Sequence, residues 1–132
     1  MMLVHVYSNG KTMDNQPVSF EEAMFLVEHQ DTYRQDKENF LGFTAPEHQD
    51  AVLQFIREEE DKWIVDIPVM NGNSYVGSYH TITTHSKTVA IITNFFIEES
   101  ELRQGIVTRD YDRVEHEMAT RWGLGIHLVP AK

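Results

Sequence analysis

The clearest pattern of hydrophobic and polar positions lies in the stretch Ala51–Val69, AVLQFIREEEDKWIVDIPV. Its apolar residues follow a period of two, with Leu53 and Phe55 before the acidic run and Trp63, Val65, Ile67 and Val69 after it. Strict alternation in a segment rich in Val, Ile and Trp predicts strands with one buried face. The acidic run Glu58–Asp61 separates the two halves, so the stretch is predicted to form a β-hairpin with an acidic turn.

Further strands are predicted on both sides of this hairpin, at Leu3–Tyr7, Phe40–Thr44, Ser74–Ile82 and Ile126–Val129. Asn71-Gly72 between two extended segments favours a type I′ turn, which requires positive φ at both central positions. Phe40–Ile82 is therefore predicted to be a four-stranded antiparallel meander. Pro68 has no N–H to donate, so it indicates a strand edge or a bulge at that point. The polar segment Thr12–Pro17 is predicted to be a loop.

Two helices are predicted from their caps and apolar stripes. Ser19-Phe20-Glu21-Glu22 forms a capping box, and a helix is expected from there to about His29. A second helix is expected to begin at Asp110 or Asp112 and to end at Gly123, which is placed for a C′ cap. Its apolar stripe consists of Tyr111, Val114, Met118 and Trp122.

The segment Thr88–Phe96, TVAIITNFF, carries mixed signals. Its β-branched residues favour a strand, with a hairpin through His85-Ser86-Lys87. The helical spacing of Val89, Ile92 and Phe96, after the cap candidates Thr84 and Ser86, favours a helix, which we prefer. The sequence therefore predicts one α+β domain, residues 1–132, with an antiparallel meander of four to five strands packed by two or three helices.

The chain is acidic, with 11 basic and 21 acidic residues and a net charge of −10 over 132 residues. This charge repels nucleic-acid phosphates and anionic membranes, so we expect neither as a partner. With 41% hydrophobic and 24% charged residues the composition is that of a globular protein. The acidic surface either keeps the protein soluble or favours a basic partner.

No motif indicates catalysis or a cofactor. There is no cysteine, which excludes disulfides, thiol catalysis and thiolate metal sites. Glu115-His116-Glu117-Met118-Ala119-Thr120 is similar to a zinc-protease helix, but Thr120 stands where the second His is needed. We therefore expect no metal and no cofactor, and the sequence favours a protein without enzymatic activity but leaves a small enzyme open. The N-terminal residues lack a basic signal-peptide region and the apolar run Val89–Ile97 is short, so a cytoplasmic protein is expected.

Two acidic runs are the candidate partner-binding residues: Glu58, Glu59, Glu60 and Asp61, and then Glu98, Glu99 and Glu101. Such runs are usually solvated, but an acidic turn at the end of a rigid hairpin is also suited to electrostatic docking on a basic protein. Trp63, next to the first run, is predicted to be a core residue, with an interface anchor as the alternative.

The order of segments resembles bacterial immunity proteins, which neutralise the toxin domains of contact-dependent and polymorphic toxin systems. The resemblance covers residues 18–100 and lies in a capped helix (SFEEAMFLVEHQ), a meander (AVLQFIREEEDKWIVDIPVMNGNSY) and a following segment (SKTVAIITNFFIEES). It implies a non-enzymatic inhibitor that covers a basic toxin. Two alternatives are a small-molecule-binding or small enzyme domain, with a pocket lined by His80, Tyr79, Tyr75 or His116, and a homo-oligomer that pairs through a sheet edge.

Overall fold

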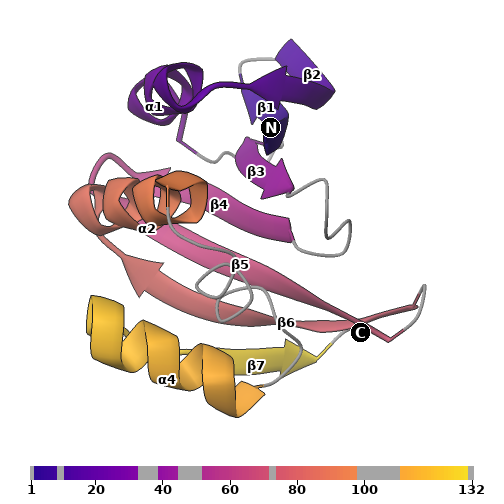
Figure 1. Ribbon diagram of the computed structural model, residues 1–132, viewed down its shortest axis with the longest axis vertical. Coiled ribbons are helices and arrows are strands. Elements are labelled where there is room, and N and C mark those ends of the chain that lie inside the picture. The colour runs from indigo at the N-terminus through magenta and orange to yellow at the C-terminus, as the bar shows by residue number, and fades with distance from the viewer. Residues whose placement is uncertain are drawn as a thin grey trace.

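The computed structural model describes residues 2–8, 11–32, 39–44, 52–71, 74–97 and 111–130. They form a seven-stranded antiparallel sheet with the order β2-β1-β3-β4-β5-β6-β7 (Figure 1). Its strands are β1 (Met2–Ser8), β2 (Lys11–Val18), β3 (Phe40–Thr44), β4 (Val52–Glu59), β5 (Lys62–Asn71), β6 (Ser74–Thr83) and β7 (His127–Pro130). The described helices are α1 (Phe20–Glu28), α2 (His85–Ile97) and α4 (Tyr111–Trp122). The predicted α+β class with an antiparallel sheet is confirmed.

The predicted meander is the consecutive run of strands from β3 to β6. Phe55 pairs with Val65 and Val65 pairs with Thr81, which places the alternating apolar residues of neighbouring strands on one face. The acidic turn is shorter than expected, because Glu58 and Glu59 belong to β4 and the turn itself is Glu60-Asp61. Most of the predicted turn after Asn71 lies outside the described residues.

Pro68 lies where its missing N–H is tolerated. The pairing of β4 with β5 ends at Asp66, so at Pro68 β5 has a described neighbour only on the β6 side. The register with β6 then shifts between Val69 and Met70. The expectation of an edge or a bulge near Pro68 is confirmed.

The prediction of a loop over Thr12–Pro17 is wrong, because this segment lies within strand β2. Its sequence, KTMDNQPV, has no apolar alternation, and Gln16 and Pro17 are exposed. The strand forms at the edge of the sheet, where the backbone ladder to β1 holds it. Strand formation of this kind depends on the neighbouring strand, so the local sequence carries little signal for it.

All three predicted helices are present. The cap of α1 and the C-terminal cap of α4 are as expected, Asp112 lies inside α4, and Asp110 lies outside the described residues. The side chain of Ser19 accepts a hydrogen bond from the Glu22 N–H at 3.1 Å, and Glu22 Oε1 accepts one from the Ser19 N–H at 3.1 Å. Gly123 has a φ of 67° at the end of α4, and the Leu124 N–H donates to the Met118 carbonyl at 2.9 Å. The ambiguous segment 88–97 is helical, as part of α2.

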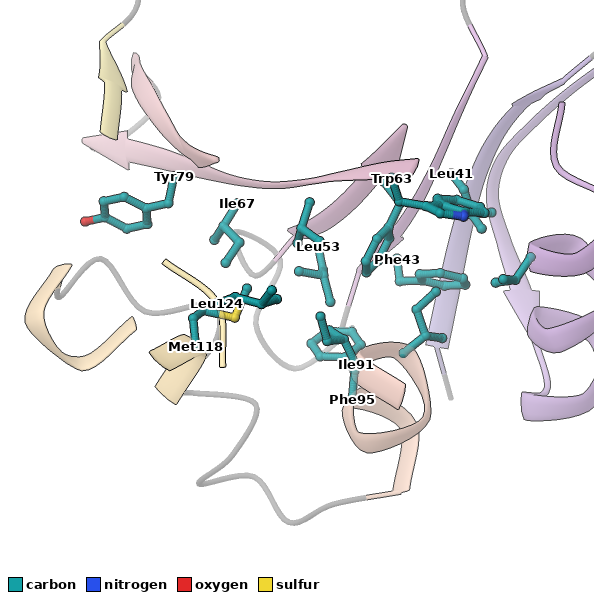
Figure 2. Close-up of a cluster of buried hydrophobic side chains, with 14 of the residues drawn as sticks. Leu41, Phe43, Leu53, Trp63, Ile67, Tyr79, Ile91, Phe95, Met118 and Leu124 are labelled. Atoms are coloured by element: carbon teal, nitrogen blue, oxygen red, sulfur yellow. The ribbon is translucent and has the colours of Figure 1, made fainter. Parts of the chain in front are cut away.

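The core lies between the sheet and the helices α2 and α4, which cover one of its faces (Figures 1 and 2). Helix α1 packs beside α2 through an edge-to-face contact of Phe20 and Phe96, whose ring centroids are 6.0 Å apart. The largest fully buried side chains are Trp63, Phe43, Phe55 and Phe95. Burial of each contributes about 1.5–3 kcal/mol, so this layer dominates the stability. Trp63 is fully buried, as predicted for a core residue.

Among the described helices, none has the length and apolar character needed to cross a bilayer.

Candidate protein-binding surface

The first acidic run lies at the end of the β4–β5 hairpin, and all four of its residues are exposed. Glu58 forms an ion pair with Lys62 at 3.2 Å. The side chains of Glu59 and Glu60 have no hydrogen-bond or ion-pair partner among the described residues. The second candidate run, Glu98, Glu99 and Glu101, lies outside the described residues.

Arg57 fixes the backbone of this turn. Its Nη2 and Nε atoms donate to the Glu60 carbonyl at 2.8 and 3.1 Å, and its Nη1 atom donates to the Gln30 carbonyl at 3.1 Å. The guanidinium carbon lies 5.3 Å from the centroid of the Trp63 ring. One arginine therefore joins the turn to the chain that follows α1, and its planar group rests on the core tryptophan.

Asp61 joins the same turn to the start of α2. Its Oδ1 atom accepts a hydrogen bond from the His85 N–H at 2.9 Å, and His85 is the first residue of the helix. A carboxylate at this position satisfies a backbone donor that lacks an intrahelical partner and is favoured by the helix dipole. The Thr84 hydroxyl accepts from the Lys87 N–H at 3.3 Å, which makes Thr84 the N-cap, as expected.

The His85 side chain connects the core to α1. Its Nδ1 atom accepts a hydrogen bond from Trp63 Nε1 at 3.2 Å, and its Nε2 atom lies 2.9 Å from Glu28 Oε1. Because Nδ1 is the acceptor, the proton of the neutral ring is on Nε2 and is donated to Glu28. The hydrogen bond from His85 lowers the pKa of the Glu28 carboxyl below its ordinary value, which favours the ionised form of Glu28.

These contacts bring five carboxylates from two parts of the chain to one end of the sheet. We call this surface the acidic corner, and it consists of Glu28, Glu58, Glu59, Glu60 and Asp61. Glu28 comes from the last turn of α1, and the other four come from the β4–β5 hairpin. Arg57, Asp61 and His85 join α1, the β4–β5 hairpin and α2 to one another. The exposed carboxylates therefore project from a fixed backbone.

The alternative pocket, lined by histidine and tyrosine, is not brought together. The residues of β6 alternate between faces, so Tyr79 is buried on the helix side while its neighbour His80 lies on the opposite face. On that opposite face His80 Nε2 lies 2.6 Å from Asp66 Oδ1, and the Tyr75 hydroxyl lies 2.5 Å from the Ser78 hydroxyl. His116 is exposed on α4. Within the described residues no three His, Asp or Glu side chains are arranged to hold a metal ion.

Burial raises the pKa of the Asp66 carboxyl, because desolvation outweighs the stabilising effects of His80 and the Ser78 hydrogen bond. A raised carboxyl pKa beside a histidine is sometimes a sign of catalysis. Here the two residues form a cross-strand pair of β5 and β6, on the face of the sheet opposite the core. We therefore interpret it as a structural contact between the two strands.

Sequence reasoning found the four hairpin acids but not the residues that position them. Glu28 and His85 are 57 residues apart and are joined only by the packing of α1 against α2. Arg57 gave no signal, because a single basic residue before an acidic run is common. The capping role of Asp61 has no local pattern, since the helix that it caps begins 24 residues later.

Comparison of the chain with protein-family models, with curated proteins and with solved structures found no match. The resemblance to immunity proteins therefore stays a prediction.

Proposed function

We propose that this protein is a non-enzymatic binding domain that docks a basic protein through its acidic corner, as an immunity-type inhibitor of a toxin does. The observation that carries the proposal is the fixed backbone of the acidic turn. Arg57 holds the Glu60 carbonyl, Asp61 holds the first N–H of α2, and the Glu59 and Glu60 carboxylates are left exposed to solvent.

This arrangement suits docking for two physical reasons. A fixed turn loses little conformational entropy on binding, because its backbone is ordered beforehand. Exposed carboxylates that have no intramolecular partner among the described residues also lose no internal ion pair when a basic surface arrives. Clustered charge of one sign raises association rates with a basic partner by about 10- to 1,000-fold at low salt.

The test begins with a library of genomic fragments from the encoding organism, displayed on phage and selected on the immobilised protein. Association rates of each recovered fragment are then measured at several salt concentrations. We expect recovered fragments to be basic, and we expect their association rates to fall about tenfold or more between low and physiological salt.

The decisive variant changes Glu59 and Glu60 to Lys, and its matched control changes Glu115 and Glu117 on α4 to Lys. Both variants alter the net charge equally, but only the first alters the acidic corner. We expect the first to lower the association rate about tenfold and the control to lower it far less. Equal rates for the two variants, or the recovery of acidic fragments, would refute the proposal.

A further inference from the structure

A hollow of about 170 Å³ lies beside α1 and is lined by Val18, Glu22, Phe25 and Leu26. The Phe25 side chain is 63% exposed, although its helix buries Ala23 and Val27. Packing of the core therefore does not account for an aromatic residue at this position. Phe25 precedes Glu28 by three residues, which places it on the same side of α1 as this member of the acidic corner.

The polar group at the hollow is fixed in place. Glu22 Oε1 accepts the capping hydrogen bond from the Ser19 N–H, and among the described residues its second oxygen has no partner. The Phe25 ring is packed against the His29 ring, with centroids 4.2 Å apart. The hollow thus combines an aliphatic floor, an aromatic wall and a positioned carboxylate.

We propose that this hollow receives an arginine side chain of the basic partner, an inference that rests on the proposed function. The methylene groups of an arginine match the apolar surface of Val18 and Leu26. Its guanidinium is the group that stacks on an aromatic ring and bonds a carboxylate, here Phe25 and Glu22. A purely apolar side chain would leave the carboxylate desolvated, and the more strongly hydrated ammonium of lysine stacks less well.

Two peptide probes of equal charge, hexaarginine and hexalysine, test this assignment by titration at one low salt concentration. The wild-type protein is expected to bind hexaarginine about three- to fivefold more tightly than hexalysine. Replacing Phe25 by Ala or Leu is expected to bring this ratio to about one while leaving hexalysine binding nearly unchanged. Leu keeps the apolar wall and removes the aromatic ring, so it isolates the stacking contact.

The control variant is Tyr75→Ala, which removes another exposed aromatic ring, on β6. It is expected to keep the preference for arginine. Equal binding of the two peptides by the wild type, or an unchanged ratio in Phe25→Ala, would overturn the arginine assignment. The variant with Glu59 and Glu60 changed to Lys separates the arginine assignment from the proposed function, since it should weaken the binding of both peptides. If it weakens neither, the acidic corner itself is the wrong surface.

Discussion

His85 is the residue whose replacement most directly tests how the acidic corner is attached to the core. In His85→Ala the indole N–H of Trp63 loses its acceptor, and Trp63 is fully buried. A buried donor without a partner costs about 1–3 kcal/mol, because its desolvation is no longer offset. The bond to the exposed Glu28 carboxylate contributes little by comparison. We therefore expect His85→Ala to lower the free energy of unfolding by about 1–3 kcal/mol.

The variant His85→Asn separates the two bonds. Its side-chain oxygen occupies the position of the His85 Nδ1 atom, so it accepts the hydrogen bond from Trp63 but does not reach Glu28. We expect it to recover at least about half of the loss. Glu28→Gln removes the charge at the other end and, as an exposed substitution, should change stability by less than about 0.5 kcal/mol.

The assay is urea unfolding followed by far-ultraviolet circular dichroism, with linear extrapolation to water. A loss of 1 kcal/mol should also lower the melting temperature by about 3–5 °C for a chain of this size. If His85→Ala is as stable as the wild type, or His85→Asn as unstable as His85→Ala, the buried Trp63 bond is not what ties α2 to the hairpin.

The remaining predictions concern Asp66 and the end of α4. Burial raises the pKa of Asp66 above its ordinary value of 3.8, so the folded protein holds this proton more tightly than the unfolded chain. The free energy of unfolding should therefore fall as the pH rises from 3.8 through the raised pKa. Urea midpoints measured against pH should show this fall in the wild type but not in Asp66→Asn. Parallel curves for the two proteins would contradict the prediction. Gly123→Ala should cost about 1–2 kcal/mol at a φ of 67°, and Gly125→Ala, with nothing near its added Cβ, should be close to neutral in the same titration.

Much of the fold could be predicted because its signals are local. The alternation from Trp63 to Val69, the capping box at Ser19 and the cap at Gly123 each lie within a single strand or helix. Hydrogen bonding and side-chain periodicity act over these short distances, so a window of the sequence contains the whole cause. Strand β2 was missed because its cause lies in another segment, the edge of β1.

The candidate site also contains residues that a local pattern reveals and residues that only tertiary packing brings together. The hairpin acids were visible as a run, but Glu28, Arg57 and His85 meet only after α1 and α2 pack on the sheet. The hollow beside Phe25, in contrast, is lined by near neighbours in the chain, from Val18 to Leu26.

By itself, the sequence determined an acidic α+β domain, the meander from β3 to β6, the helices α1 and α4 and the acidic character of the β4–β5 turn, and it favoured a helix over a strand at α2. Only the tertiary structure decided that β2 extends the sheet and that Glu28 joins the hairpin acids through His85. The physical reason is the distance along the chain over which each interaction acts. Periodicity and capping act between near neighbours. Contacts across 57 residues depend instead on strand register and helix placement, which the whole core determines.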